Sequence, residues 1–145
     1  MERYYHLKKG VTMKRIRRFG VSLEEDLFRE LDGLVRRHKF PNRSQAIRFL
    51  IRKNSAEEAW ENNAQVSGAL VLIFDHHKRR FIDRSLDIQH DFGDSILATQ
   101  HVHLDHHNCL EIIALKGNAQ RLKTLADTLI ALKGIKHGKL IMTKA

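Results

Sequence analysis

The sequence predicts an α+β protein with a small N-terminal β-α-α domain and a C-terminal β-α-β-β-α-β domain of the ferredoxin-like class. The charge supports this division. The whole net charge of +9 lies in residues 1–53, which hold 15 Lys+Arg and 6 Asp+Glu, whereas residues 54–145 hold 11 of each. Eight of the ten histidines lie in the neutral part. A basic domain joined to a histidine-rich one indicates two partners, the first of them a polyanion such as nucleic acid.

The composition also limits the class of protein. Apolar residues make up 42% of the 145 residues, which is enough for a packed core. No run of 18 apolar residues is present, so we expect no membrane-spanning helix and no membrane partner. The charged N-terminus does not resemble a secretory signal, and a single cysteine cannot form an internal disulfide. These two features predict a cytoplasmic protein.

The first elements are an arm and a strand. Residues 1–15 predict a flexible basic arm, and residues 16–23 predict a strand because apolar and polar side chains alternate. A single strand needs a partner, and a domain of residues 16–54 is too small to bury a stable core alone. We therefore expect two chains to pair these strands as a ribbon, which the major groove of DNA admits. The exposed ribbon face would present three residues to the bases: Arg18, Gly20 and Ser22.

Two helices are expected to follow the strand. Ser22 and Glu25 match a capping box, which predicts that the first helix opens here, and the only proline ends it. Asn42 or Ser44 then caps the second helix. The N-terminus of this second helix would offer backbone N–H groups, Arg43 and Ser44 to a DNA phosphate.

The remaining elements predict the second domain. Residues 55–64 are polar and acidic, and we expect them to extend the second helix and then form a linker to a domain of residues 65–145. Strands are predicted over residues 66–74, 95–104, 109–115 and 140–143, and helices over residues 81–92 and 119–132. This order of elements is that of a ferredoxin-like split unit.

A histidine–cysteine cluster in the second domain indicates a metal site. His101 and His103 alternate along a strand and share one face, whereas Val102 and Leu104 are expected to point into the core. Cys109 opens the next strand and can return close to His103. Two imidazoles and a thiolate form a partial site for a borderline or soft divalent metal.

The fourth ligand decides which metal is expected. An open tetrahedral position would suggest catalytic zinc, whereas a fourth imidazole in a plane would suggest Ni(II) or Cu(II). His90 is the best candidate for this ligand, supplied by the same subunit or by a second one.

Other polar residues near the cluster could assist it or simply be solvated. Glu111 shares a strand face with Cys109 and could hydrogen-bond a ligand histidine. His106 and His107 lie in the predicted turn and could support the ligands or form an auxiliary metal site. His76 follows a strand beside an aspartate and is a further candidate for a supporting role.

Six stretches of the chain together match a known pattern. They are RFGVSLEEDL, NRSQAIR, DIQH, HVHLDHHNCLEI, LKGN and GIKHG, spread over roughly residues 17–143. The chain thereby resembles the NikR family of nickel-responsive transcriptional regulators. The resemblance is specific, because the DNA-binding and metal-binding motifs occur in the expected order.

The resemblance implies a ribbon–helix–helix domain fused to an ACT-like nickel-binding and tetramerisation domain. It implies a homotetramer, a dimer of dimers, that binds a palindromic operator in double-stranded DNA and represses nickel-uptake genes. One Ni(2+) per subunit would lie in a planar site of His101, His103 and Cys109 from one subunit and His90 from another.

Two other functions compete on the residues alone. A metal-dependent hydrolase would need a general base, and only Glu111 is evident. A constitutive DNA-binding protein could instead sense a small molecule with its second domain. The four ligand-type residues favour the nickel-dependent regulator over both, so we expect no enzymatic activity.

Overall fold

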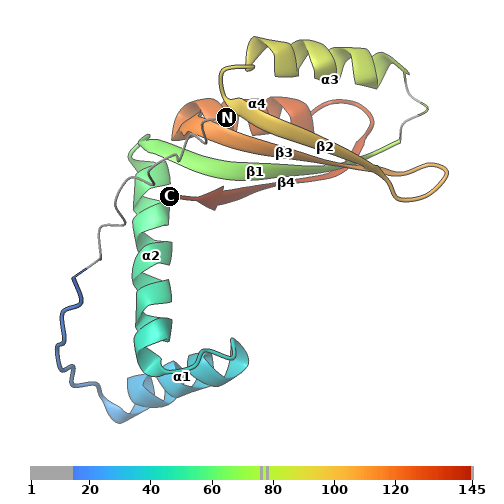
Figure 1. The fold of residues 1–145 in the computed structure, drawn as a ribbon. Helices are drawn as coiled ribbons and strands as arrows, with labels where there is room; N and C mark the ends of the chain where they lie inside the picture. The colour runs from blue at the N-terminus through green and yellow to red at the C-terminus, as the bar shows by residue number, and fades with distance from the viewer. Residues whose placement is uncertain (1–14, 76, 78, 145) are drawn as a thin grey trace, which may run out of the picture.

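The computed structural model describes residues 15–75, 77 and 79–144 (Figure 1). The elements are α1 (Glu25–Arg37), α2 (Arg43–Glu61), β1 (Gln65–Phe74), α3 (Arg79–Asp91), β2 (Ile96–His103), β3 (Cys109–Asn118), α4 (Ala119–Ile130) and β4 (Ile135–Thr143). The strands form one antiparallel sheet in the order β2-β3-β1-β4. The α+β class and the β-α-β-β-α-β order of the second half are therefore confirmed. The expected basic arm lies almost wholly outside the described residues.

The N-terminal part differs from the sequence prediction at two points. Residues 15–24 carry no assigned strand in the single chain, as expected of a segment whose strand partner would have to come from another molecule. The predicted capping box is wrong. Glu24 occupies the N-cap position of α1 without a side-chain hydrogen bond, so the helix begins beyond the reach of Ser22. Acidic residues in the first turn and basic residues in the last favour α1 through the helix dipole instead.

Helix α2 begins at a side-chain cap and runs without a break toward the sheet. Asn42 accepts a hydrogen bond from the backbone N–H of Gln45 at 3.0 Å, which confirms the cap. The helix continues for 19 residues, so the predicted extension beyond residue 54 is confirmed. Only residues 62–64 separate α2 from β1. In Figure 1, α2 stands away from the sheet and carries α1 at its far end.

The C-terminal turn of α2 is anchored on the sheet by Trp60. Its side chain is 2% exposed, and Nε1 donates a hydrogen bond to the carbonyl oxygen of Thr143 at 2.9 Å. The indole lies against Gly68 of β1, where an added Cβ would be 3.2 Å from Trp60 Cζ2. Glycine at this position therefore allows the ring to pack directly on the strand.

The core lies between α4 and one face of the sheet. Alternate residues of β1 and β3 are buried against the apolar stripe of α4: Leu70, Leu72, Phe74, Cys109, Ile113, Leu115, Leu122, Leu125 and Leu129. The prediction that Val102 and Leu104 enter the core is wrong, because they are 37% and 52% exposed on the other face. His103 pairs with the buried Cys109, so both side chains point to the face of the sheet that packs against the core. The candidate ligands therefore lie on that face.

Gly138 marks a tight contact between β4 and α4, and its replacement with alanine is expected to destabilise the fold. An added Cβ would lie 2.5 Å from Cγ1 of Ile130 and 3.1 Å from Cδ2 of Leu72. Overpacking of this kind costs about 1–3 kcal/mol of unfolding free energy. Denaturant unfolding at fixed protein concentration measures it. Gly20→Ala is the control, because a Cβ there meets nothing within 4 Å. Equal midpoints for both variants would contradict the prediction.

Candidate metal centre

Strand register brings the predicted ligands to one place. His101 pairs with Glu111 and His103 pairs with Cys109 across β2 and β3. Directly paired residues of antiparallel strands point to the same face. The four side chains therefore point to the same face of the sheet, near the end of the β2–β3 hairpin.

Three of these residues can bind one ion together. One potential ligand atom from each of His101, His103 and Cys109 lies within 4.8 Å of the other two. Cys109 Sγ lies 3.2 Å from Nδ1 of His103, and the two imidazole rings are 5.2 Å apart. Cys109 is buried whereas both histidines are exposed. An ion bound here would therefore lie between the buried thiol and the solvent, where a further ligand could reach it.

The surroundings of Cys109 keep its thiol protonated. Burial raises the pKa of the Cys109 thiol above its usual value of 9.0, and the nearby charges of Asp105 and Asp75 raise it further. A metal ion needs the thiolate as its ligand. Binding at this centre must therefore displace a proton.

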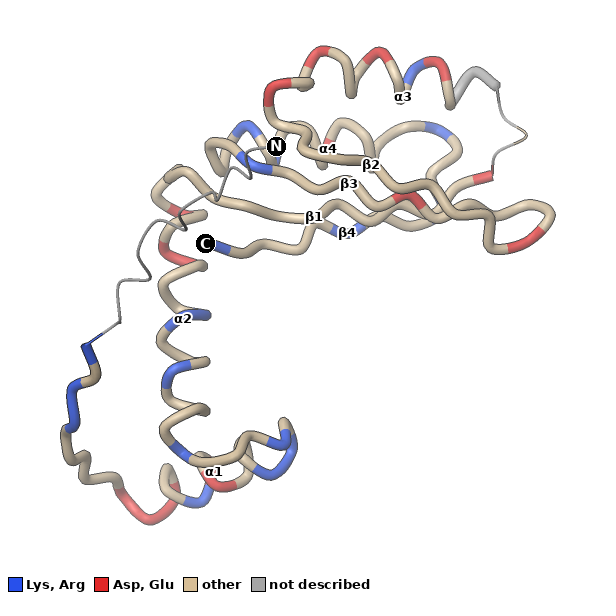
Figure 2. The backbone as a smooth tube through the Cα atoms, viewed as in Figure 1, with Lys and Arg blue, Asp and Glu red and all other residues tan. Residues whose placement is uncertain are grey.

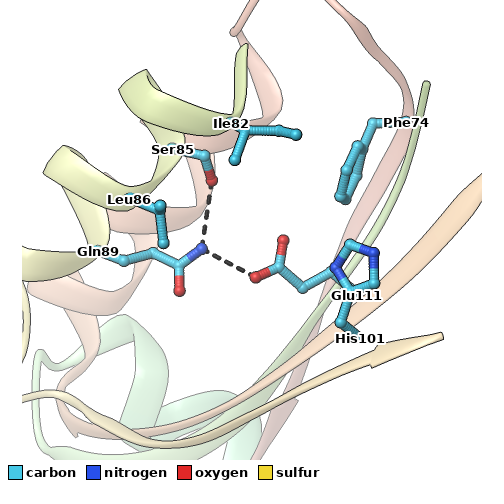
Figure 3. A pocket seen from close by; sticks show the side chains of 7 residues that line it. All are labelled: Phe74, Ile82, Ser85, Leu86, Gln89, His101 and Glu111. Carbon is cyan, nitrogen blue, oxygen red and sulfur yellow. Dashed lines mark hydrogen bonds between the residues drawn. The ribbon is translucent and has the colours of Figure 1, made fainter. Parts of the chain in front are cut away.

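A hydrogen-bond chain joins the strand behind the ligands to α3 (Figure 3). Glu111 is 7% exposed, and its carboxylate accepts a hydrogen bond from Nε2 of Gln89 at 2.9 Å. The same Gln89 nitrogen lies 3.2 Å from Oγ of Ser85. Figure 3 shows these side chains lining a small cavity that Phe74 and His101 border on the sheet side. In the described residues, no hydrogen bond joins Glu111 to a ligand histidine, so its expected partner is replaced by Gln89.

Gln89 is a residue that the sequence prediction missed. A signal for it was present: Ile82, Ser85, Leu86 and Gln89 are spaced three and four apart, which places them on one helix face. That face lines the cavity. The next residue, His90, is turned about 100° around the helix and is exposed.

His90 is not grouped with the other predicted ligands in the single chain. Among the described residues, the ligand group at the hairpin contains only His101, His103 and Cys109. His90 lies in the last turn of α3, and the hydrogen bonds of Gln89 turn the neighbouring helix face toward the cavity. The prediction of His90 as a ligand therefore depends on a second chain.

The turn between β2 and β3 is well ordered by Asp105. Its carboxylate accepts hydrogen bonds from the backbone N–H groups of His107 and Asn108 at 2.8 Å and from the Asn108 side chain at 2.7 Å. These bonds lower the pKa of Asp105 to about 2, with the Asn108 side chain as the largest cause. His106 contributes its backbone carbonyl oxygen, 2.9 Å from Nε2 of His77. The expected supporting residue His76 lies outside the described residues.

The predicted DNA-binding residues lie on the basic half of the molecule. Figure 2 shows lysines and arginines on the segment before α1 and along α1 and α2. Arg18, Gly20, Ser22 and Ser44 are all exposed. Arg43 is exposed as well, but its guanidinium binds both carboxylate oxygens of Asp32, at 2.6 and 2.9 Å.

The Arg43 side chain therefore has a structural partner within the domain. It also lies over the ring of Phe28, 4.5 Å from the centroid. The hydrogen bond from Arg43 lowers the pKa of the Asp32 carboxyl. Arg43 thus joins α1 to the start of α2, with its side chain still 52% exposed.

No helix in the described part of the chain is long and apolar enough to cross a membrane.

Known proteins resemble this chain in both fold and sequence. An uncharacterized protein from Thermotoga maritima superimposes with a TM-score of 0.51, covering 55% of this chain and 99% of that chain; at 15% identity the likeness concerns the fold alone. The NikR C terminal nickel binding domain matches residues 67–143. A nickel-responsive regulator of Desulfovibrio desulfuricans is 53% identical over 126 residues, 87% of this chain and 91% of the relative.

A second such regulator, from Syntrophus aciditrophicus, is 47% identical over 128 residues, 88% of this chain and 93% of the relative. The relatives are named as regulators, which is a non-enzymatic role and confirms that the chain is not an enzyme. Both the matched domain and the near full-length relatives lead to one conclusion: the chain belongs to the NikR family of nickel-responsive regulators.

Proposed function

We propose that this protein is a nickel-dependent transcriptional regulator that binds operator DNA. The observation that carries the proposal is the convergence of His101, His103 and Cys109 on one sheet face, inside the stretch that matches a nickel-binding domain. The names of the relatives support the same role. We further propose that it acts in the cytoplasm and represses nickel-uptake genes when one Ni(2+) per subunit is bound.

The donor set fits Ni(II). Imidazole and thiolate suit borderline divalent ions, and planar nitrogen-rich sites are typical of Ni(II) and Cu(II). Neighbouring donors around an ion with bonds near 2.1 Å lie about 3 Å apart, and Cys109 Sγ and His103 Nδ1 are already 3.2 Å apart. When bound, the ion would supply a positive charge that keeps the thiolate ionised and joins the two strands to the fourth ligand.

We assign that fourth position to His90 of a second subunit. His90 is exposed in its own chain, as are His101 and His103. The open face of the sheet supports association of the second domains. Its apolar residues are half-buried or exposed in the single chain: Ala69, Val71, Ile73, Val102, Leu110, Ile112 and Ile141. An uncovered apolar sheet face is a typical contact surface.

The N-terminal domain supports a second contact between chains. Ile16, Phe19 and Val21 are 85%, 75% and 59% exposed. Further apolar residues of α1 and α2 are also exposed: Leu27, Phe28, Leu50 and Ile51. Pairing the segments before α1 as a two-stranded ribbon would bury these side chains and complete a ribbon–helix–helix dimer. Two kinds of contact in one chain give a dimer of dimers, and hence a homotetramer.

The ribbon would place Arg18, Gly20 and Ser22 in the major groove, where two-stranded ribbons read DNA. Ser44 and the N-terminus of α2 would contact a phosphate. Because the two strands are related by a two-fold axis, the operator is expected to be palindromic. The basic N-terminal third supplies the salt-dependent affinity for the DNA backbone.

Nickel and DNA binding are coupled only if nickel prefers the arrangement of domains that fits the operator. Trp60 offers a physical connection, because it ties the DNA-binding end of the chain to β4 and β1. The hydrogen bonds of Gln89 and Glu111 tie the helix of His90 to the ligand strands. The DNA-binding helices and the helix of His90 are thus both attached to the same sheet.

The test of the function is a gel-shift titration of promoter fragments with no metal, Ni(II), Zn(II) or Cu(II). We expect tight, saturable binding with Ni(II) and only weak, salt-sensitive binding without metal. A random DNA fragment of equal length is the control. Equal affinity with and without Ni(II) on every operator candidate would overturn nickel dependence.

Nickel affinity is expected to rise with pH. The raised pKa of Cys109 keeps the free thiol protonated at neutral pH, so each binding event releases this proton. The apparent affinity should then increase about tenfold per pH unit between about pH 7 and pH 8. Competition titrations against a chelator of known pH dependence measure the slope. A constant affinity over this interval would show that no thiol proton is displaced.

Mixing two inactive variants tests whether the ligands come from different chains. Chains with His90→Ala or Cys109→Ala alone should lack complete nickel sites. A tetramer assembled from both should regain some, because a site between chains can then combine intact ligands. Equilibrium dialysis of the refolded mixture gives the number of tight sites. The same count as in the separate variants would instead place His90 and Cys109 in one chain.

A further inference from the structure

A second group of potential ligands lies outside the proposed nickel site. Asp75 follows β1, His77 lies in the connection to α3, and His107 lies in the turn between β2 and β3. One potential ligand atom of each lies within 4.8 Å of the other two. Asp75 is half-buried and both histidines are exposed, so an ion from solution can reach them. Two loops that are far apart in sequence therefore bring nitrogen and oxygen donors close together.

Hydrogen bonds orient His77 for this role. Its backbone N–H donates to Oδ1 of Asp75 at 3.0 Å, which holds the carboxylate beside the ring. Its Nε2 lies 2.9 Å from the backbone carbonyl oxygen of His106. A carbonyl oxygen only accepts, so Nε2 carries the proton and Nδ1 is the basic nitrogen. Metal-binding histidines commonly donate their second N–H to a carbonyl in this way.

The turn that carries His107 is held independently. The backbone N–H of His107 donates to Asp105, and the Asn108 side chain receives a hydrogen bond from Lys136 of β4 at 2.6 Å. The rings of His77 and His107 are 5.6 Å apart and inclined by 62°. The donors are thus presented by two ordered loops.

We infer that Asp75, His77 and His107 are the ligands of a second site, which binds a divalent transition ion such as Ni(II) or Zn(II). Two imidazoles and a carboxylate suit such borderline ions. Donors that share one ion lie about 3 Å apart when adjacent and about 4.2 Å apart when opposite, so these atoms, already within 4.8 Å of one another, can close on an ion by side-chain rotation. The site contains no thiolate and leaves coordination positions for water, so it binds more weakly than the site at Cys109.

The second ion would join the start of α3 to the tip of the hairpin. Asp75 and His77 precede the helix that carries His90, and His107 lies between the ligands of β2 and β3. This site is distinct from the proposed nickel centre, because it needs neither Cys109 nor another chain. Its occupancy would stabilise the folded chain by mass action.

The experiment isolates this site in the full chain with Cys109→Ala. Equilibrium dialysis with Ni(II) alone and with Zn(II) alone counts the ions that remain. We expect a weakly bound equivalent in this background. His107→Ala or His77→Ala, added to Cys109→Ala, should weaken its binding at least about tenfold. His106→Ala is the matched control, since it changes a neighbouring ring but keeps the carbonyl that His77 binds. X-ray absorption of the Zn(II)-loaded Cys109→Ala chain should show nitrogen and oxygen ligands only.

Unchanged binding in the His77 and His107 variants, or no ion beyond the nickel site in the unmodified chain, would overturn the second site. A failure of the nickel proposal is recognised separately. In that case Cys109→Ala keeps the tight binding of the unmodified chain, while the loss caused by His107→Ala still reports on the second site. A loss equal in His106→Ala would also count against the assignment, because that ring is not a ligand.

Discussion

Replacing Cys109 with alanine is expected to abolish tight nickel binding and nickel-dependent DNA binding. The thiolate is the only sulfur donor in the chain's ligand group, and it lies 3.2 Å from Nδ1 of His103. Loss of a partner that merely supports a ligand costs about 10–100-fold in metal affinity, so loss of the ligand itself should cost more. Competition titration and gel shift on the same preparation measure both effects.

The control for Cys109→Ala is His137→Ala. His137 is an exposed histidine on β4 that pairs with Ile73, away from the ligand group. It should retain the nickel affinity and the operator binding of the unmodified protein. Nickel-stimulated DNA binding that survives Cys109→Ala would refute the assignment of the metal centre.

Replacing Trp60 with alanine is expected to cause the largest loss of stability. The side chain is 2% exposed, fills the junction between α2 and the sheet, and donates a hydrogen bond to Thr143. Truncating a buried tryptophan costs about 3–5 kcal/mol of unfolding free energy. Circular dichroism during denaturant unfolding measures it at one fixed chain concentration, because assembly also contributes to stability. Trp60 is the only tryptophan, so its fluorescence cannot serve all variants.

Trp60→Phe separates packing from the hydrogen bond. Phenylalanine keeps an aromatic ring against Gly68 but removes the Nε1 donor, so the loss should be smaller, of the order of 1 kcal/mol for the hydrogen bond itself. If Trp60 also transmits nickel occupancy to the DNA-binding end, this variant should bind nickel normally but show a smaller nickel effect in gel shift. A Trp60→Ala chain as stable as the unmodified one would show that the junction contributes little.

Much of the C-terminal fold could be predicted because its signals are local. The apolar run before Phe74 and the helical spacing after Ala119 each depend on residues near in sequence, and the structure confirms both elements. The segment before α1 is different. Its strand needs hydrogen bonds from another chain, so neither local pattern nor a single chain completes it.

The candidate site shows the same division. The alternation of His101 and His103 and the position of Cys109 after a short turn could be read from the chain, and the register of β2 and β3 brings them together. Which face of β2 is turned toward the core could not be read from the sequence. Val102 and Leu104 look like core residues, but which face of a strand is covered depends on where α4 packs.

The sequence by itself predicted the elements of the second domain, the separation of charge from histidine, and three candidate ligands that the structure brings together, because each rests on residue type and short spacing. Only the tertiary structure decided which sheet face covers the core, that Arg43 binds Asp32, and that Gln89 holds Glu111. It also brought Asp75, His77 and His107 together. These depend on contacts between distant segments, whose geometry is set by packing of the whole chain rather than by any local pattern.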